Sequence, residues 1–399
     1  MKSLHGIRLL DLTHMLSGPY GAMLLADMGA DTIKVEPPAA GEGTRKLLAK
    51  NPRFSLKGMG AYFLTLNRNK RSVCIDLKSE EGRELFYGLV RESDVVMDNF
   101  SAGVTDRLKI DHETLAAINP RIITCSVTGF GSAGPDPHRP AFDQVIQGMG
   151  GGMSITGEPG GRPLRAGIPI GDLSGGMFAA MGVLSAVVAR QQTGRGQHVD
   201  ISMLDCQISM LNYMATMYSL SGENPKPLGN GHFVHVPYNT FDTATQPIII
   251  AVIFDSFWEN LVEIVGIPEF RNEKYLTQQG RFDDRDFINS RLQEELLTRS
   301  ADEWIALLKE MRIPVAPVNN FEQALSDPQI RYRNMVVNVS HPEGGSTEMP
   351  GNPVKLSETY EDSYAPPPLL GQHTDEVLGG LLGLDGGRLE ELRAKSVIR

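Results

Sequence analysis

The sequence predicts an α/β fold in which a large domain built on a parallel sheet is followed by a smaller α/β domain. Strand and helix signals alternate over about the first 130 residues, the pattern of parallel strands joined by crossover helices. With 399 residues and 41% hydrophobic content, the chain is too long for one ordinary core and too apolar to be disordered. The stretch Ser221–Gly231, rich in Gly, Pro and Asn, indicates a linker between two domains.

The elements of the large domain follow from local signals. Proline in the first turn of a helix loses no hydrogen bond, so Ser17-Gly18-Pro19 opens a helix, and Ser79 caps a later one. Strands are predicted at Ile7–Leu12, Thr32–Glu36, Arg71–Asp76, Asp94–Asp98, Arg121–Thr128 and His198–Ser202, and further helices at Asp172–Gln192 and from Met203 to about Leu220.

The rest of the chain carries signals of its own. Ser256 with Glu259, and Ser300 with Glu303, have the spacing of capping boxes. The predicted parts are a large domain at 1–223, a small domain at 224–333, and a C-terminal part at 334–399 whose helices dock back on the large domain. Strands are predicted at Pro247–Phe254 and Ile313–Val318, helices at Phe257–Val265, Trp304–Met311, Thr374–Leu382 and Gly387–Ala394, and an extended Pro-rich segment at Ser340–Gln372.

Charge and cysteine content restrict the partners. The formal net charge of −10 argues against nucleic acid or an anionic membrane surface, and an anionic ligand would need a local basic pocket. Cys74, Cys125 and Cys206 are widely spaced, so we expect no disulfide framework and a cytoplasmic location. The uncharged run Leu173–Ala189 follows Asp172 directly and contains three glycines, which favours a buried helix over a membrane span.

Motifs of several other enzyme classes are incomplete or absent. Gly129–Gly134 has the spacing GxGxxG, but the prolines that follow cannot continue the helix that a dinucleotide needs, so we expect a turn at the carboxyl edge of a sheet. His232 and His235 lack a third metal ligand nearby. No Walker motif, HExxH or GxSxG elbow occurs, and we expect neither a metal nor a permanently bound cofactor.

Two features have both a structural and a functional interpretation. The basic cluster Asn67–Arg71 is either a solvated loop or a phosphate clamp. Asp172 stands among glycines at the start of the long helix, where an N-cap contributes about 1 kcal/mol. Alternatively, the helix N-terminus keeps this carboxylate ionised, the glycines leave room for a bulky electrophile, and Asp172 is a nucleophile.

Nine stretches along the chain match the pattern of one known family. They are DLTHMLSGPYGAMLLADMGADTIKVEPP (11–38), LNRNKRSVCIDLKSEEG (66–82), DNFSAGVTDRL (98–108), RIITCSVTGFGSAGP (121–135), GIPIGDLSGGMFAAMGVLSAV (167–187), TGRGQHVDISMLD (193–205), LGNGHFVHVPYNTF (228–241), IPVAPVNN (313–320) and PPLLGQHT (367–374). In order and spacing, the chain resembles the class III CoA-transferases, which include formyl-CoA, carnitine and dicarboxylate CoA-transferases. The resemblance runs almost end to end.

The resemblance implies that Asp172 is the catalytic nucleophile. Its attack on an acyl-CoA thioester would give an aspartyl anhydride and CoA thiolate, and return of the thiolate would give an aspartyl-CoA thioester and release the donor acid. An acceptor carboxylate then reverses these steps without water, metal or redox cofactor. The implied partners are an acyl-CoA and a small carboxylic acid, and KVEPP followed by GxxTR is closer to members that act on dicarboxylic acids.

The resemblance also implies binding residues. Gly229, Gly231 and His232 match a mobile glycine loop that covers the aspartate near the acceptor, with an interrupted glycine run in this chain. Arg139, Arg165 and His232 are the candidates for holding a second carboxylate of the acceptor. Contacts with CoA are expected from Met15, Leu16, Asn67, Lys70, Asn99, Phe100, Arg107 and Phe142, with Lys70 and Arg107 near the nucleotide.

Two alternative functions are compatible with the same motifs. Racemases of 2-methylacyl-CoA share the fold but pair the aspartate with a histidine, so that two bases serve opposite faces of the α-carbon. Phe142 occupies the place of that histidine and cannot transfer a proton, while His138 lies four residues earlier. The other alternative is a non-catalytic CoA-binding protein that does not use Asp172. The family implies a Rossmann-like large domain, a smaller α/β domain, a C-terminal return and an interlocked homodimer.

Overall fold

The computed structural model describes residues 1–399, whose contacts divide the chain into two units. Unit 1 comprises residues 1–152, 165–222 and 329–399. Unit 2 comprises residues 153–164 and 223–328, so a short segment that precedes the long helix groups with the smaller unit.

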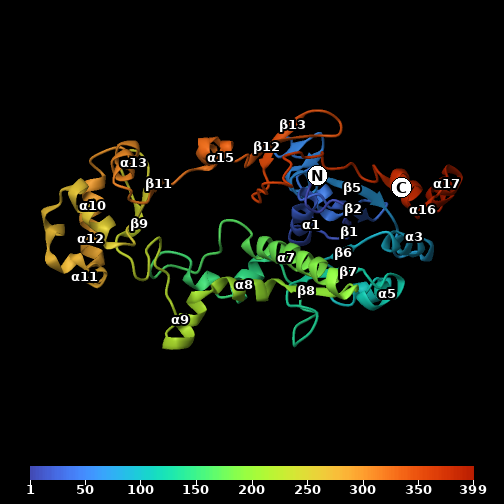
Figure 1. Cartoon of the computed structure of the whole chain (residues 1–399), viewed down its shortest axis with the longest axis horizontal. Coiled ribbons are helices and arrows are strands. Elements are labelled where there is room, and N and C mark those ends of the chain that lie inside the picture. The colour runs from blue at the N-terminus through green and yellow to red at the C-terminus, as the bar shows by residue number, and fades with distance from the viewer. The chain divides into compact units, whose positions relative to one another are not determined.

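Unit 1 is built on a sheet of six strands, all parallel (Figure 1). The first strand of the chain lies inside the sheet, and the chain winds outward from it in both directions, which is the strand order of Rossmann-like folds. In sheet order the strands are β5 (Lys70–Cys74), β2 (Asp31–Glu36), β1 (Arg8–Asp11), β6 (Val95–Asp98), β7 (Ile123–Thr128) and β8 (His198–Ser202).

Helices cover both faces of this sheet, because side chains along each strand alternate between its two faces. Leu9 of β1 packs in the same cluster as Ala179 of one helix layer, and Leu10 packs in the same cluster as Phe86 of the other. One face is covered by α1 (Ser17–Asp27) and α7 (Ile170–Thr193), and the other by α3 (Glu80–Arg91), α5 (His112–Ile118), α16 (Thr374–Leu382) and α17 (Gly386–Ala394).

The C-terminal return to the large unit is confirmed. Val377 and Leu378 of α16 and Leu392 of α17 are fully buried in the cluster that contains α3. Ile398 then forms an antiparallel bridge with Ile75, directly after β5. The end of the chain therefore lies against the carboxyl edge of the sheet.

The remaining elements of unit 1 depart from the sequence prediction at two places. The helix expected from Met203 to Leu220 is interrupted at Asn212, which has a positive φ of 49°. The segment expected to be extended from Ser340 begins as a hairpin. These elements are α2 (Ala61–Leu66), α4 (Val104–Leu108), α6 (Asp143–Met149), α8 (Met203–Leu211), α9 (Tyr213–Ser221), α15 (Pro328–Tyr332), β3 (Ser55–Leu56), β4 (Met59–Gly60), β12 (Val336–Ser340) and β13 (Ser346–Pro350).

Unit 2 has its own core around an antiparallel sheet of three strands, with Trp258 and Trp304 buried in it. The capping box of Ser300 and Glu303 is confirmed. The sheet order is β11 (Val315–Pro317), β10 (Ile248–Ala251), β9 (Tyr238–Phe241), and the helices are α10 (Asp255–Val265), α11 (Gln278–Asp283), α12 (Arg285–Leu296), α13 (Ala301–Glu310) and α14 (Phe321–Ser326).

The capping box expected from Ser256 and Glu259 is wrong. Helix α10 begins two residues earlier than predicted, at Asp255, and Phe254 occupies the N-cap position without a side-chain cap. Ser256 is therefore already helical and cannot act as the N-cap.

Helices α1 and α7 approach each other closely because both carry glycines at the contact. A Cβ on Gly21 would lie 2.7 Å from the carbonyl oxygen of Gly176, and a Cβ on Gly176 would lie 2.5 Å from the carbonyl oxygen of Ser17. Gly175 is likewise blocked by the Ser17 hydroxyl at 2.5 Å. The glycines after Asp172 thus serve the packing of the two helices, and the prediction that they make room for a substrate is wrong.

Helix α7 is partly exposed within this chain. By length and composition alone this helix could cross a membrane. Its apolar stretch has a mean hydropathy of 1.5, and 39% of that stretch is buried in this chain. Its buried face, including Ala179 and Val183, packs in the cluster with the sheet. Met181 and Val188 on other faces are exposed, so the expectation of a buried helix holds for one side only.

Candidate active site

Two cavities lie at the carboxyl edge of the sheet in unit 1, around the point between β1 and β6 where the strand order reverses. Open α/β sheets bind ligands at this point. The first cavity, the groove, has a volume of about 860 Å³ and lies mainly beside the loops after β1, β2 and β5. The second, the acid pocket, has a volume of about 590 Å³ and lies beside the loops after β1, β6 and β7 and the start of α7. His14 and Phe100 line both cavities.

The acid pocket brings together most of the predicted site residues. It is closed on one side by the loop at 137–144, which contains Phe142, and on another by 165–172, which contains Arg165. The predicted residues that line it are Met15, Leu16, Asn99, Phe100, His138, Arg139, Phe142, Arg165 and Asp172.

Asp172 is the third residue of α7 and not its N-cap, so the capping interpretation is wrong. Pro169 occupies the N-cap position and offers no side-chain cap. Instead, Asp143 of α6 accepts the backbone N–H groups of Gly171 at 2.8 Å and Asp172 at 3.3 Å through Oδ1. Because Asp143 satisfies the helix start, the Asp172 carboxylate is left without a hydrogen-bond or ion-pair partner.

The environment of Asp172 opposes its ionisation. Burial in the acid pocket, and then the negative charge of Asp143, raise the pKa of Asp172 to about 7. The helix N-terminus was expected to keep this carboxylate ionised, which would lower its pKa. That expectation is wrong, because the pKa of Asp172 is raised. Once ionised, a carboxylate with this pKa is more basic than an ordinary one, which suits a nucleophile.

A pH profile tests this environment. Under the hypothesis that ionised Asp172 is the nucleophile, kcat/KM should rise with pH through about 7. Asp143→Asn keeps an oxygen for the two backbone N–H groups but removes the charge, so the rise should move to lower pH. Measurement of kcat/KM against pH for both proteins checks the shift. A rise at the same pH in the variant would show that Asp143 has no electrostatic influence on Asp172.

The loops after β1 and β6 are fastened to each other at the strand reversal. Asn99 accepts the backbone N–H of His14 at 2.7 Å and donates to the His14 carbonyl at 2.7 Å. The rings of His14 and Phe100 lie 5.4 Å apart. The wall shared by the two cavities is therefore held by paired hydrogen bonds.

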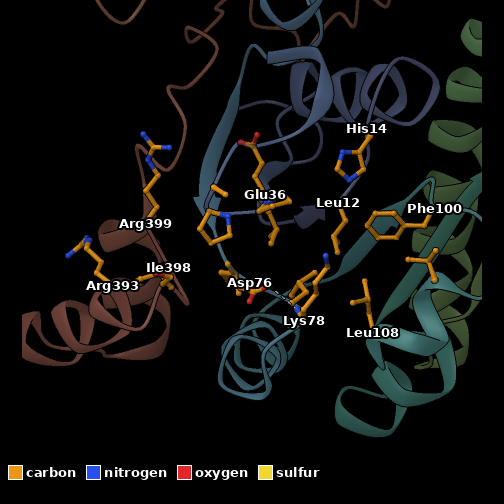
Figure 2. A pocket seen from close by; sticks show the side chains of 18 residues that line it. Leu12, His14, Glu36, Asp76, Lys78, Phe100, Leu108, Arg393, Ile398 and Arg399 are labelled. Atoms are coloured by element: carbon orange, nitrogen blue, oxygen red, sulfur yellow. Dashed lines mark hydrogen bonds between the residues drawn. The ribbon is translucent and has the colours of Figure 1, made fainter. Parts of the chain in front are cut away.

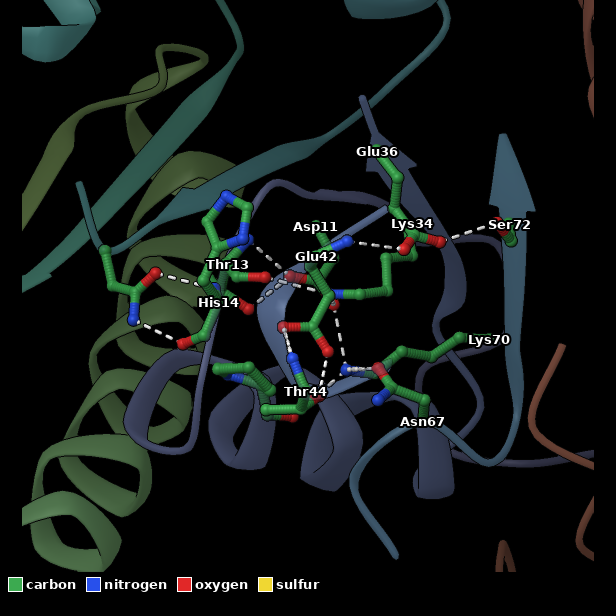
Figure 3. Close-up of polar contacts among 12 residues, drawn as sticks. Asp11, Thr13, His14, Lys34, Glu36, Glu42, Thr44, Asn67, Lys70 and Ser72 are labelled. Atoms are coloured by element: carbon green, nitrogen blue, oxygen red, sulfur yellow. Dashed lines mark hydrogen bonds and ion pairs between the residues drawn. The ribbon is translucent and has the colours of Figure 1, made fainter. Parts of the chain in front are cut away.

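Lys70 is a buried structural cation, and its predicted contact with CoA phosphates is wrong for this geometry (Figure 3). Its Nζ lies 2.8 Å from Oδ2 of Asp11, 3.1 Å from the carbonyl oxygen of Pro19 and 3.2 Å from Oδ1 of Asn67, which uses all three donors. The Lys70 side chain is 0% exposed, and Asn67 is buried beside it. Burial lowers the pKa of Lys70 to about 8 despite the attraction of Asp11.

This buried network supports the loop that carries Met15 and Leu16 (Figure 3). Lys34 donates to the Thr13 carbonyl at 2.8 Å, and Glu42 accepts the Met15 N–H at 3.4 Å. Burial raises the pKa of Asp11, but Lys34 and Lys70 outweigh it and bring the value to about 2. Met15 has a positive φ of 65°, a strained conformation that such support sustains.

The groove combines apolar walls with cations that the sequence interpretation missed (Figure 2). Lys78 is exposed two residues after Asp76, and no acidic side chain pairs with it. Arg107 of α4 is exposed beside Val104 and Leu108 of the groove wall but lines neither cavity, so its predicted contact with CoA stays a prediction. The groove is lined by Leu12, His14, Val35, Glu36, Pro37, Pro38, Ala39, Ile75, Asp76, Leu77, Lys78, Phe100, Val104, Leu108, Arg393, Ser396, Ile398 and Arg399.

The predicted glycine loop belongs to unit 2. The N–H of Gly229 donates to the carbonyl oxygen of Gly157 at 2.9 Å. Gly231 and His232 line a polar cavity of the same unit. Nδ1 of His232 accepts the backbone N–H groups of Val234 and His235, so it is occupied within the loop. The structure contains no cluster of side chains suited to holding a metal ion. Covering of Asp172 by this loop stays a prediction.

A doubly wound parallel sheet, a half-buried carboxylate at its carboxyl edge and a groove beside it that carries the unpaired Lys78 are features of an α/β enzyme with a ligand site at the strand reversal. The chain belongs to CoA-transferase family III, whose model matches residues 4–374, and it is a CoA-transferase. This confirms the resemblance and the α/β fold with a large parallel sheet.

Similar proteins span nearly the whole chain. It is 37% identical to an acetyl-CoA:oxalate CoA-transferase of Acetobacter aceti, over 91% of each chain. It is 38% identical to a succinyl-CoA:mesaconate CoA-transferase of Haloarcula hispanica, over 95% of this chain and 96% of that one. The crystal structure of a CAIB/BAIF family protein from Brucella suis aligns with a TM-score of 0.84 at 36% identity, covering 95% of this chain and 99% of that one.

Proposed function

We propose that the protein transfers CoA from an acyl-CoA to a small dicarboxylic acid, with Asp172 as the nucleophile. The observation that carries the proposal is the unpartnered Asp172 carboxylate in a pocket that shares His14 and Phe100 with a cationic groove. The nucleotide of CoA occupies the groove, where apolar walls suit an adenine ring and cations suit phosphates. The pantetheine arm passes His14 and Phe100 and presents the thioester to Asp172.

The reaction then proceeds by four substitutions at carbonyl carbons. The Asp172 carboxylate attacks the acyl-CoA thioester and expels CoA thiolate, which leaves an aspartyl acyl anhydride. The thiolate attacks the aspartyl carbonyl of this anhydride, which forms an aspartyl-CoA thioester and releases the donor acid. The acceptor carboxylate attacks that thioester, and the thiolate finally attacks the acceptor's carbonyl in the new anhydride. This yields the product acyl-CoA and regenerates Asp172.

The acceptor is a dicarboxylic acid in this proposal. The similar enzymes are named for oxalate and mesaconate, both dicarboxylates. Arg139 and Arg165 line the acid pocket with Asp172, so either can hold the carboxylate that does not react. Arg139 also pairs with Asp136 at 3.3 Å, on an exposed loop.

We further propose that the protein works as a cytoplasmic homodimer. All three cysteines are free and buried, as expected in a reducing compartment. Helices α7 to α9 carry exposed apolar side chains, among them Met181, Val188, Ile208 and Leu220, which a second copy would cover. Light scattering of the purified protein tests the dimer.

A product screen tests the transfer. Purified protein is incubated with succinyl-CoA, acetyl-CoA or formyl-CoA and a panel of mono- and dicarboxylic acids, and new thioesters are identified by mass. The proposal expects exchange with dicarboxylic acids. Exchange of the α-hydrogen of a 2-methylacyl-CoA in heavy water without transfer would instead indicate a racemase, for which His138 in the acid pocket is the available second base.

Substitution of Lys78 tests the place of the nucleotide. Lys78→Ala should raise KM for acyl-CoA about tenfold, with a smaller effect on kcat, because the lost contact binds substrate and transition state alike. Steady-state kinetics with varied acyl-CoA check this. An unchanged KM would contradict the proposal that the nucleotide of CoA binds in the groove. Lys46→Ala, another exposed lysine of unit 1 that does not line the groove, is the matched control.

A further inference from the structure

One turn of helix α6 holds both ends of a segment that forms a wall of the acid pocket. Asp143 and Gln147 lie four residues apart on this helix, and Nε2 of Gln147 donates to Oδ2 of Asp143 at 2.7 Å. Oδ1 of Asp143 accepts the N–H groups of Gly171 and Asp172. Oε1 of Gln147 accepts the N–H of Ala166 at 2.9 Å. The two side chains therefore fix the chain at Ala166 and again at the start of α7.

The position of residues 165–168 depends on Gln147. This glutamine is 3% exposed, and both polar atoms of its amide are hydrogen-bonded. The bond to Ala166 is the one hydrogen bond that joins residues 165–168 to another element of the structure. The other bonds of the segment are local, such as that from the N–H of Ile170 to the carbonyl oxygen of Ile168 at 2.8 Å.

Arg165 extends from this segment into the wall of the acid pocket, next to the anchored Ala166. It forms no ion pair, and its Nη1 donates to the carbonyl oxygen of Ala166 at 3.1 Å. Arg139, the other arginine of the pocket, pairs with Asp136 at 3.3 Å and lies 5.2 Å from the centre of the Phe130 ring. Arg165 is thus the arginine of the pocket that has no carboxylate partner.

We propose that Gln147 is a positioning residue that sets the distance between Arg165 and Asp172, and that this distance makes the enzyme discriminate dicarboxylic acids by chain length. The inference rests on the proposed function, in which the acceptor attacks the aspartyl-CoA thioester. One carboxylate of the acceptor attacks, and Arg165 binds the other through two parallel hydrogen bonds. In the thioester Asp172 carries no charge, so it does not compete for the arginine.

The discrimination follows from the fixed distance. A dicarboxylic acid of matching length reaches Arg165 and the thioester carbonyl at the same time. A shorter or longer acid can bind Arg165 only with its reacting oxygen misplaced, and a misplacement of about 1 Å can lower a rate about 100-fold. A monocarboxylic acid makes no use of Arg165, so its rate does not depend on this distance.

A series of acceptor acids tests the assignment. The acceptors are oxalic, malonic, succinic, glutaric and adipic acids, with butyric acid as the monocarboxylic reference. Succinyl-CoA is the donor, and acetyl-CoA replaces it when succinic acid is the acceptor. For the wild type, kcat/KM with the best dicarboxylic acid should exceed that with the acids one carbon longer or shorter at least about tenfold.

Gln147→Met keeps the length of the side chain but loses both hydrogen bonds. The preference among chain lengths should fall to about threefold or less, while KM for acyl-CoA stays within about twofold. An effect transmitted through Asp143 to Asp172 would change the rates with all acids alike, so the ratio between acids isolates the distance. Arg165→Ala, at an exposed position, should lower the best dicarboxylic acid to the level of butyric acid.

Two further variants guard against a general loss of structure. Gln207→Met is the matched control, because Gln207 is also buried and donates to Oγ of Ser174 at 3.0 Å, in the first turns of α7. It should keep the preference, and equal flattening there would overturn the role of Gln147. Gln147→Glu keeps an oxygen for the N–H of Ala166 and should retain the preference, so its loss in that variant would also contradict the inference.

The remaining outcomes separate this inference from the proposed function. Transfer to dicarboxylic acids of every length at similar rates would overturn the inference and leave the proposed function standing. The same holds if Arg139→Ala, and not Arg165→Ala, removed the preference for dicarboxylic acids. No transfer to any carboxylic acid would overturn the proposed function itself.

Discussion

Asp172→Asn is expected to lower the rate of CoA transfer at least about 1,000-fold, because an amide cannot form the acyl anhydride. Folding should survive, since Asp143 and not Asp172 satisfies the start of α7. Near neutral pH the variant should be no less stable than the wild type, because the amide removes the cost of keeping an ionised carboxylate in the acid pocket. Product thioesters measured by mass, together with denaturant unfolding, check both statements.

The matched control is Asp205→Asn, an exposed aspartate in the first turn of α8. It should keep normal transfer. Incubation of the wild type with acyl-CoA, followed by hydroxylamine, should modify the peptide that contains Asp172 and leave the variant's peptide unmodified. Near-normal transfer by Asp172→Asn would sink both the mechanism and the substrate proposal that depends on it.

The same substitution should change how stability depends on pH. The folded-state pKa of Asp172, about 7, is above that of an unfolded aspartate, so the folded chain holds this proton more tightly. Its contribution to stability is complete below the unfolded pKa and is lost as the pH rises through about 7. Asp172→Asn should therefore flatten the stability profile between about pH 4 and 7.

Lys70→Ala is expected to destabilise the protein by about 3–5 kcal/mol, because it leaves Asp11 buried with only the more distant Lys34 as a charged partner. Denaturant unfolding measures this loss. If the variant stays folded, any change in its KM for acyl-CoA should come from the altered loop around Met15, because Lys70 itself does not contact the substrate. Lys78→Ala, on an exposed lysine, should change the free energy of unfolding by less than about 0.5 kcal/mol.

The pair of lysines thus gives opposite expectations. If Lys70→Ala had normal stability and a raised KM, the conclusion would be that Lys70 contacts the substrate. Its buried contacts with Asp11 and Asn67 would then not describe its role.

The sheet was predictable because its strands are short apolar runs punctuated by glycine, proline and caps. All six parallel strands lie where the sequence puts them, and the helix Thr374–Leu382 has the predicted bounds. The errors occur where a distant residue decides the local structure. The cap of α7 comes from Asp143, 28 residues before Gly171, and no local pattern reveals it.

The site was predictable to the extent that family motifs mark it. Asp172, Asn99 and Phe100 meet in one pocket although they lie on separate loops. The prediction for Lys70 was wrong because a cluster of basic residues in the sequence does not reveal whether each side chain is buried. Its ion-pair partner, Asp11, lies 59 residues away in the chain. Lys78 carried a usable signal, since it follows a predicted strand at the sheet edge where ligands bind.

The glycine contact between α1 and α7 has a consequence for the precision of the reaction. Helix α1 begins at the loop that carries Met15 and Leu16, and Asp172 is the third residue of α7. With backbone resting on backbone at Gly21 and Gly176, no flexible side chain separates the two helices. The distance between the Met15 loop and Asp172 is therefore set by a backbone contact, and a larger side chain at Gly21 or Gly176 would push the two apart.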